Sequence, residues 1–449
     1  MTGSGSPLRA ELTCASGCDV HLPLSTTEFQ CPKCSGLLAV THDVAALKET
    51  SGAAWRERFA ARRHSIAPID ASGVWSKREW VHPLVSEADI VTVGEGATPL
   101  THAKRLGQAW GVPSLFVKQC GTSHTGSFKD LGMTVLVSNV VHAVRTGALA
   151  SPVVACASTG DTSAALAAYG AAAGLPVVVL LPKGLVSTAQ LLQPLAHGAH
   201  VLALETDFDG CMVIVRELAR RGLVYLANSM NAIRIEGQKT VAFEIAEQLG
   251  WEVPDWVVLP GGNLGNSAAL HVGFSLMREL GVTDRMPRLC VAQAANADPL
   301  YRAFVAGKET VDAVAAKRTA ASAIQIGRPV SAPRAMAALR AMNGVVEEAT
   351  EDELADAAAF ADRTGLYACP HTAVALAALQ KLLAKGTVRG TERVVVVSTA
   401  SALKFTEFKL GYHEGRLPEA EARRRNEPVT LPPNADAVAK VVAGLAHRQ

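Results

Sequence analysis

A regular alternation of short apolar runs and longer helix-like runs limits the fold of this chain more than any other feature of its sequence. The apolar runs are rich in Val and Leu, as buried strands of parallel sheets are. Strands that alternate with helices form parallel sheets with helices on both faces. We therefore predict an α/β fold of open, mostly parallel sheets. Strands are expected at residues 115–119, 152–157, 177–181, 200–204, 255–260, 288–293 and 393–398, and helices at 44–63, 131–144, 164–173, 207–221, 236–249 and 267–280.

The composition is that of a globular protein with ample apolar side chains for its cores. Hydrophobic residues make up 49% and charged residues 19% of the 449, and the formal net charge is +2. So small a net charge gives no reason to expect nucleic acid or a membrane as a partner. Residues 162–182 carry no charge and are long enough to span a bilayer. Because Gly174 and Pro176 interrupt them, we expect a helix followed by a buried strand instead.

The nine cysteines fall into two groups. Five occur singly, mostly within or beside apolar runs, as buried thiols in a reducing compartment do. The start of the chain, Met1–Ser6, lacks the apolar core of a signal peptide. We therefore expect a cytoplasmic protein. The five single cysteines are Cys120, Cys156, Cys211, Cys290 and Cys369.

The other four cysteines form two pairs, Cys14 with Cys18 and Cys31 with Cys34, separated by 12 residues. Four thiolates can close a tetrahedral structural site around Zn²⁺. The first pair encloses three residues, whereas a zinc ribbon usually has two. Two interpretations stay open, a structural zinc site without a catalytic position and a set of free thiols in an N-terminal arm.

Four polar loops follow expected strands, at the edge of a parallel sheet where ligands bind. They comprise residues 121–130, 158–163, 261–266 and 398–401. A single polar loop carries little information, but four at equivalent strand ends indicate one shared pocket.

The loop at 121–130 joins a strand to a helix and contains one lysine, Lys129. The positive end of the helix dipole disfavours an ammonium group and so lowers its pKa. Lysines that form Schiff bases have such lowered pKa values. Taken alone, this loop suits an ordinary surface lysine in a first helical turn better.

The loop at 261–266 reads Gly-Gly-Asn-Leu-Gly-Asn between a strand and a helix. Glycines let several backbone N–H groups approach a phosphate, which the helix dipole also favours. The glycine spacing differs from that of a P-loop and of a dinucleotide fingerprint. A tight turn without a ligand is the alternative. Together with Lys129 and the hydroxyl groups of the other two loops, this cradle matches pyridoxal phosphate, which needs an amine, a phosphate site and a partner for its ring nitrogen.

Residues 125–130, Thr-Gly-Ser-Phe-Lys-Asp, resemble the lysine motif of fold-type II pyridoxal-phosphate enzymes, and the longer run 123–134 resembles threonine synthases of the plant-like class. The resemblance covers about residues 70–412. It implies a tryptophan synthase β-like fold, with the cofactor in the cleft between two domains. Further similar runs are residues 73–80, 157–163, 227–229, 236–240, 261–266 and 399–404.

The resemblance implies the conversion of O-phospho-L-homoserine and water to L-threonine and phosphate, the last step of threonine biosynthesis. By this likeness Lys129 forms the Schiff base and moves protons at Cα and Cβ of the substrate. It also implies a homodimer. The implied cofactor-binding residues are Lys129, Phe128, Asp161, Gly261, Gly262, Asn263, Leu264, Gly265, Asn266 and Thr399, the last facing the ring nitrogen. The implied substrate-binding residues are Ser158, Thr159, Asn228, Ser229 and Arg234, of which Arg234 suits a phosphate group.

The chain departs from the family in one place and agrees with its plant-like class in another. Ser401 and Ala402 stand where the family often has His-Gly, so the role of that histidine is open. Asp161 stands where other fold-type II enzymes usually have asparagine, and the plant-like class shares the aspartate.

Two other functions compete with this interpretation. Another fold-type II enzyme, such as threonine dehydratase or a cysteine synthase, would share Lys129 and the glycine loop without needing a phosphate clamp. A non-catalytic binding protein would need neither. We expect four regions, namely an N-terminal extension (1–90) with the cysteine arm at 11–40, a large cofactor-binding domain (91–138 and 230–412), a small α/β domain (139–229) and a tail (413–449).

Overall fold

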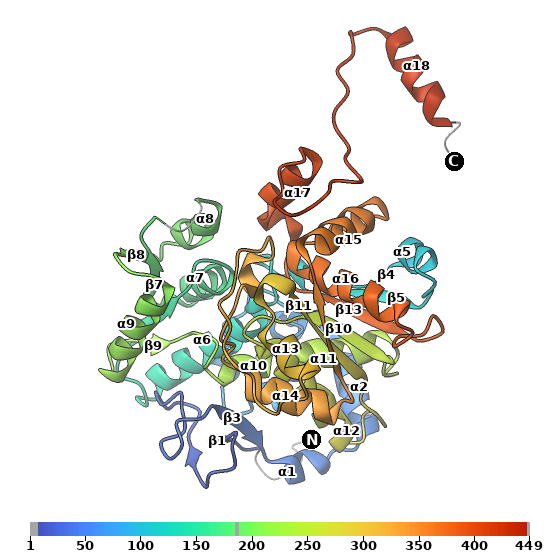
Figure 1. Cartoon of the computed structure of the whole chain (residues 1–449). Coiled ribbons are helices and arrows are strands. Elements are labelled where there is room, and N and C mark those ends of the chain that lie inside the picture. The colour runs from blue at the N-terminus through green and yellow to red at the C-terminus, as the bar shows by residue number, and fades with distance from the viewer. Residues whose placement is uncertain (1–7, 185–187, 447–449) are drawn as a thin grey trace.

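The computed structural model describes residues 8–184 and 188–446, and the segment Met1–Ser6 lies outside them. Three sheets organise the chain (Figure 1). The first is antiparallel and N-terminal, in the order β2 (His21–Leu22), β1 (Ala10–Cys14) and β3 (Leu38–His42).

The second sheet has six strands, all parallel except β4 at its edge. The third has four parallel strands. The order of the second sheet is β12 (Val345–Ala349), β11 (Arg288–Ala294), β10 (Trp256–Pro260), β13 (Val394–Ser398), β5 (Leu115–Gln119) and β4 (Leu100–His102). The order of the third is β8 (His200–Leu204), β7 (Val177–Pro182), β6 (Val154–Ala157) and β9 (Tyr225–Leu226).

Helices connect and cover these sheets, as the alternating pattern predicts. They are α1 (Val44–Lys48), α2 (Gly52–Arg63), α3 (Pro68–Ala71), α4 (Arg78–Val81), α5 (Lys104–Ala109), α6 (Lys129–Arg145), α7 (Asp161–Ala173), α8 (Thr188–Ala196), α9 (Phe208–Arg220), α10 (Ile233–Gln238), α11 (Thr240–Gln248), α12 (Gly265–Glu279), α13 (Pro299–Val305), α14 (Ala332–Ala341), α15 (Glu351–Arg363), α16 (Pro370–Ala384), α17 (Thr406–His413) and α18 (Ala435–Ala446).

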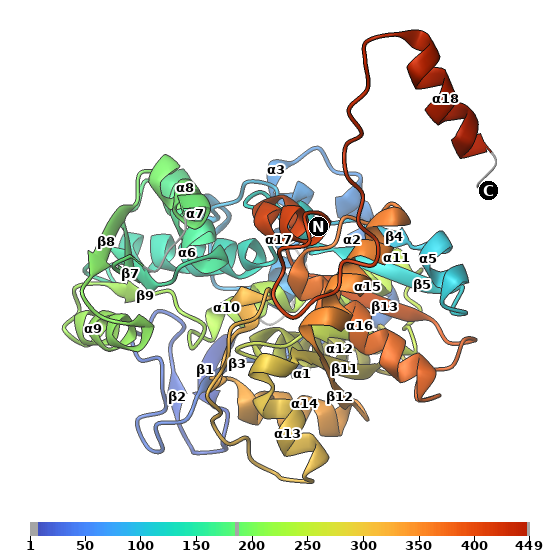
Figure 2. The same cartoon turned by 45° about the horizontal axis from the view of Figure 1, so that its top comes forward.

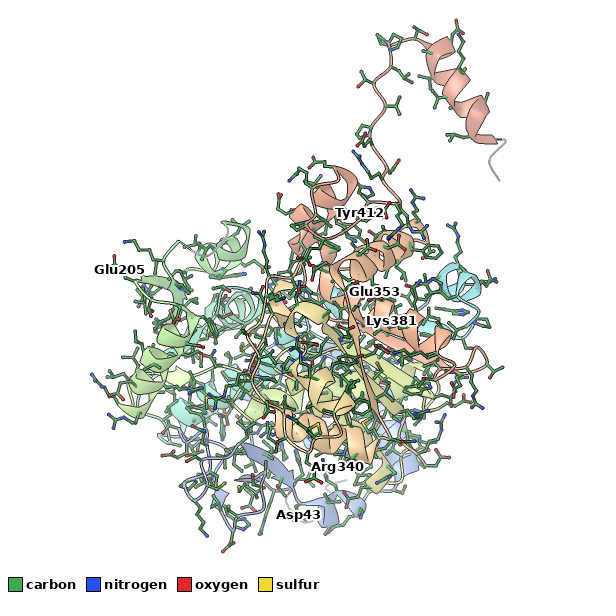
Figure 3. The ribbon with its side chains drawn as sticks, viewed as in Figure 1. Asp43, Glu205, Arg340, Glu353, Lys381 and Tyr412 are labelled. Atoms are coloured by element: carbon green, nitrogen blue, oxygen red, sulfur yellow. The ribbon has the colours of Figure 1, made fainter. Side chains whose placement is uncertain are left out.

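The six-stranded sheet separates two hydrophobic cores. Val395 and Val397 of β13 belong to the core that α6, α11 and α12 cover, whereas Val394 and Val396 belong to the core beneath α15 and α16. Side chains of a strand point alternately to its two faces, so a continuous valine run fills both cores. On the outer side, Lys381 of α16 lies 3.4 Å from Glu353 of α15 (Figure 3).

Two predicted helices are divided in the structure. The helix expected at 44–63 is α1 and α2, because the Ser51 side chain accepts a hydrogen bond from the backbone of Ala54 and begins a new helix. The helix expected at 236–249 begins earlier, at Ile233, and is interrupted between α10 and α11, where the Thr240 hydroxyl donates to the carbonyl of Gly237.

The uncharged stretch at 162–182 divides as predicted. Helix α7 ends at Ala173 and is capped by Gly174, whose φ of +66° is the left-handed conformation that glycine adopts readily, and β7 begins at Val177. Within residues 8–184 and 188–446, no helix is long and apolar enough to cross a membrane. Within the tail, α18 stands apart from the body of the molecule in both views (Figures 1 and 2).

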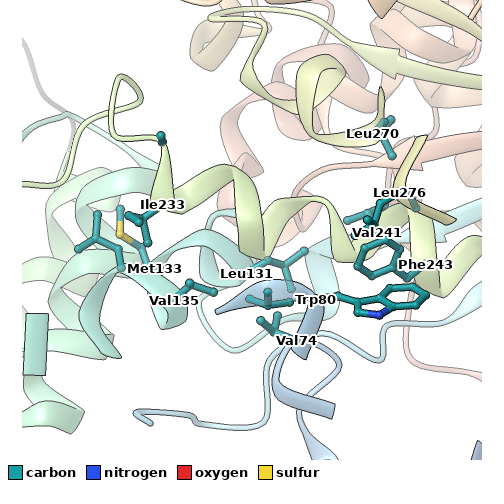
Figure 4. Close-up of a cluster of buried hydrophobic side chains, with 14 of the residues drawn as sticks. Val74, Trp80, Leu131, Met133, Val135, Ile233, Val241, Phe243, Leu270 and Leu276 are labelled. Atoms are coloured by element: carbon teal, nitrogen blue, oxygen red, sulfur yellow. The ribbon is translucent and has the colours of Figure 1, made fainter. Parts of the chain in front are cut away.

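The extension before residue 91 packs onto the main body through buried aromatic side chains. The Trp80 ring lies edge-on to those of Phe59 and Phe243, with centroids 4.7 Å and 5.1 Å away. Figure 4 shows Trp80 of α4 beside Phe243 of α11, within one apolar cluster. The Trp75 indole donates a 2.7 Å hydrogen bond to Thr134 of α6.

This packing predicts that Phe243→Ala lowers the free energy of unfolding by about 3–5 kcal/mol, because it leaves a cavity in the aromatic cluster. Urea denaturation followed by tryptophan fluorescence measures the change. Ile66→Ala is the control, since that side chain is fully exposed and its removal should change the free energy by less than about 0.5 kcal/mol. Equal effects of the two substitutions would contradict this account of the cluster.

Candidate active site

One pocket lies at the carboxyl ends of the parallel strands, where β10 and β5 both pair with β13 and so end at the same edge. It brings together most of the residues that the sequence singled out. Those that line it are Phe128, Lys129, Asp161, Ser229, Arg234, Gly262, Asn263, Leu264, Gly265, Asn266 and Thr399.

Lys129 reaches this pocket because its loop is tied to the end of β13. The backbone N–H of Phe128 donates to the carbonyl oxygen of Thr399 at 2.9 Å, and Ser127 forms a backbone bridge with Ala400. Lys129 is then the first residue of α6, at the positive end of that helix. Residues far apart in the sequence thus face one pocket.

The Lys129 side chain is half-buried, with its amine 4.3 Å from the centre of the Phe128 ring, and it opens onto the pocket. Burial and the positive charge of Arg234 together lower its pKa to about 7, while the negative charge of Asp161 opposes them. A substantial fraction of this amine is therefore uncharged at neutral pH, as a nucleophile or general base requires.

The glycine loop leaves room that side chains would fill. A Cβ atom on Gly261 would lie 2.4 Å from the Val291 side chain, and one on Gly262 would lie 2.9 Å from the Cα atom of Ile324. Leu264 holds the left-handed φ of +64°, which turns the chain into α12 at Gly265. The first N–H groups of α12 have no acceptor within the helix.

Asn266 follows in the first turn of α12. Its side-chain amide is buried, and neither its nitrogen nor its oxygen has a hydrogen-bond partner among the described residues. Unpaired buried polar atoms beside free helix N–H groups fit an anion such as the phosphate of pyridoxal phosphate. The residues of this loop therefore fit the phosphate group of pyridoxal phosphate.

Arg234 lies in the same pocket and is only 2% exposed. Its guanidinium donates to the carbonyl oxygen of Ala227 at 3.0 Å and to the Thr162 hydroxyl at 3.5 Å, while its Nε is buried without a partner among the described residues. Burial lowers the pKa of Arg234 to about 10, so it is charged at neutral pH. A buried charge of this kind suits an anionic ligand.

Four predicted residues stand outside the pocket lining. The Asn228 amide is engaged with the backbone of Ala157, accepting at 3.0 Å and donating at 2.8 Å. The Ser158 hydroxyl accepts from the N–H groups of Gly160 and Ser163. Thr159 and Gly261 also lie outside the lining. Asn228 and Ser158 thus shape the β6 edge through their bonds to the backbone.

The sequence alone did not reveal the ion pair of Asp161 or the place of His371 in the pocket. Asp161 forms a 2.6 Å ion pair with Lys404, which also donates to the carbonyl oxygen of Thr125. His371 of α16 lines the pocket, and its Nε2 accepts from the Ala323 N–H at 3.0 Å. The sign of this in the sequence is that His371 directly follows Pro370, a residue that often begins a helix. A histidine therefore reaches the pocket from α16.

Comparison with known proteins defines the class. Residues 91–400 match the family described as "Pyridoxal-phosphate dependent enzyme". The chain is 54% identical over 399 residues to "Threonine synthase 2, chloroplastic" of Arabidopsis thaliana, covering 88% of this chain and 77% of that protein. It is 38% identical over 419 residues to "Threonine synthase" of Methanosarcina acetivorans, covering 93% and 95%.

Solved structures agree on the fold. Threonine synthase from Escherichia coli aligns with a TM-score of 0.67 at 20% identity, over 97% of this chain and 100% of that one. Threonine synthase from Brucella melitensis, whose structure is described as bound to PLP, aligns with a TM-score of 0.65 at 20% identity, over 98% and 100%. The chain belongs to the threonine synthase family, within the fold-type II pyridoxal-phosphate enzymes.

The surroundings of Lys129 predict its titration in the cofactor-free protein. Acylation of its amine by an amine-reactive reagent, followed by mass spectrometry, should reach half its maximal rate near pH 7. Arg234→Ala should move that midpoint to higher pH, because it removes a repelling positive charge. Asp161→Asn should move it to lower pH, because it removes an attracting negative charge. A midpoint near pH 10 in all three proteins would refute this electrostatic account.

Proposed function

We infer that the chain is a pyridoxal-phosphate-dependent threonine synthase, converting O-phospho-L-homoserine and water to L-threonine and phosphate. The observation that carries this proposal is one pocket that contains a lysine of lowered pKa together with two features suited to anions. The glycine loop suits the cofactor phosphate, and Arg234 suits a second anion. A substrate that carries its own phosphate would bind at Arg234, while the cofactor phosphate occupies the glycine loop.

Each residue has a proposed task in this reaction. Bound pyridoxal phosphate would supply an electron sink that stabilises negative charge on the substrate carbons. We propose that Lys129 bonds the cofactor and, once free, moves protons at Cα and Cβ. Its lowered pKa lets the amine accept and return a proton near neutral pH.

Arg234 and Ser229 would bind the substrate phosphate. Phosphate leaves from Cγ before water adds at Cβ, so a charged guanidinium serves both recognition and stabilisation of the departing anion. The Thr399 hydroxyl would face the ring nitrogen of the cofactor without requiring it to be protonated. Threonine dehydratase, the alternative, acts on a substrate without phosphate, so Arg234 would have no phosphate group to bind.

The cysteine cluster supports a separate proposal, a structural zinc ion. The sulfur atoms of Cys14, Cys18, Cys31 and Cys34 all lie within 4.8 Å of one another. Four ligands at the usual Zn–S distance of about 2.3 Å would lie about 3.8 Å apart around a tetrahedral ion. Metal analysis of the purified protein should give one zinc ion per chain.

Three broader assignments are proposals as well. The four-stranded sheet lies within residues 139–229, which supports a small domain there, with a large domain formed by 91–138 and 230–412, an N-terminal extension (1–90) and a tail (413–449). The family resemblance supports a homodimer. The buried single cysteines support a location in a reducing compartment, for which we propose the cytoplasm.

The cofactor assignment predicts a yellow protein whose Schiff-base absorption disappears in Lys129→Ala. Lys183→Ala is the matched control, because Lys183 lies on the surface and pairs with Glu205. A colourless wild-type protein that takes up no pyridoxal phosphate would overturn the assignment.

The phosphate clamp predicts that Arg234→Ala lowers turnover of O-phosphohomoserine by about 10²–10³-fold, while the cofactor absorption persists. Phosphate release, with threonine identified as the co-product, measures it. Arg220→Ala serves as control, since that exposed residue pairs with Glu217 on α9. Deamination of serine or threonine in place of phosphate release would favour the dehydratase.

A further inference from the structure

The N-terminal sheet lies against the segment that carries the proposed substrate-phosphate site. Figures 1 and 2 show β1 and β3 next to α10, and β3 contacts this helix. Residues 225–239 contain Ser229 and Arg234, so the sheet borders the active site from outside the pocket. This neighbourhood raises the question of what the N-terminal sheet does for the active site.

The strongest link between the two is a buried charge cluster. His42, the last residue of β3, lies with its Nε2 2.6 Å from Glu236 of α10. The Lys239 amine contacts both Glu236 and the His42 ring. All three side chains are at most 5% exposed. Glu236 is two residues from Arg234 on the same helix, so displacement of His42 would disturb that helix.

Further contacts spread the attachment over the segment. The Phe29 ring packs edge-on against Tyr225 of β9, with centroids 5.3 Å apart. Asn139 of α6 donates to the carbonyl oxygen of Leu24 at 3.2 Å, and Arg334 of α14 donates to that of Leu38. Residues 24–42 therefore touch both the four-stranded and the six-stranded parts of the molecule.

The geometry of the cysteine turns is that of metal-binding knuckles. The N–H of Ser16 donates to Cys14 Sγ at 3.3 Å, and the N–H of Gly36 donates to Cys34 Sγ at 3.4 Å. Backbone N–H groups that donate to cysteine sulfur atoms favour thiolate ligands. A Cβ on Gly36 would lie 3.1 Å from Cys34 Sγ, so glycine leaves space for the sulfur.

The sheet has little else to hold its turns. One of its three strands has only two residues, and a core of this size gives little stability alone. Cys31 lies two residues after Phe29, and Cys34 lies four residues before Leu38. A metal that ties these cysteines to Cys14 would thereby fix the residues that touch the main body.

We propose that a zinc ion bound by Cys14, Cys18, Cys31 and Cys34 positions the 225–239 segment, and with it the Arg234 guanidinium, for the phosphate group of the substrate. The proposal rests on the proposed function of Arg234 and on the proposed zinc site. Zinc has no chemical part in the reaction, and His42, Phe29 and Leu38 act as positioning residues.

The test uses full-length holoenzyme and the double variant Cys31→Ser/Cys34→Ser. We expect the variant to lose its zinc, to raise KM for O-phosphohomoserine at least about tenfold, and to raise the inhibition constant of inorganic phosphate by a similar factor. The cofactor absorption should change much less, whereas kcat should fall as well, because Arg234 also stabilises the departing phosphate. Lys33→Ala, a non-ligand in the same turn, should keep zinc and wild-type KM.

His42→Ala separates positioning from folding of the knuckles, because it leaves all four cysteines in place. It should retain zinc and still raise KM and the phosphate inhibition constant. Removal of zinc from folded wild-type enzyme by a chelator should reproduce these changes, and added zinc should reverse them.

Each failure points to a different error. Unchanged KM and phosphate inhibition after zinc loss would overturn the positioning proposal. Wild-type protein without zinc, or with a disulfide between these cysteines, would overturn the zinc site and the positioning with it. Wild-type enzyme that binds zinc but releases no phosphate from O-phosphohomoserine would instead refute the proposed activity.

Discussion

The active site depends on the attachment of the lysine loop to the end of β13. The hydrogen bond from Phe128 to Thr399 and the bridge from Ser127 to Ala400 place the start of α6 beside the last residues of a central strand. Parallel pairing of β5 with β13 sets up this contact, because both strands end at the same edge of the sheet. Without it Lys129 and Thr399 would not face one pocket.

Two cations share the pocket that this attachment creates. Lys129 and Arg234 are both surrounded by protein, and each carries a lowered pKa because burial penalises its charge. Their repulsion is useful, since it keeps the Lys129 amine partly neutral while Arg234 keeps its charge. Lys404 forms an ion pair with Asp161. Its positive charge offsets the negative charge of Asp161, so that Asp161 repels an anionic substrate less.

Local pattern predicted the elements of the central sheets well. Residues 115–119 form β5 with the predicted bounds, because a Val- and Phe-containing run lies between turn-forming residues. The strand β12 was not predicted, since Glu347 and Glu348 make residues 345–349 look polar. Glu347 is buried because Lys381 of α16 and Lys385 just after this helix pair with it, and such long-range ion pairs leave no trace in local periodicity.

The sequence by itself determined the α/β class, the strand-end loops and the chemistry of Lys129 and the glycine loop, because those depend on periodicity and on short motifs. Only the tertiary structure decided that Arg234 shares the pocket, that Asn228 bonds the backbone of Ala157, and that His371 enters from α16. These facts depend on which segments meet across two sheets. Spacing along the chain cannot encode them, since packing between distant elements fixes where each side chain lies.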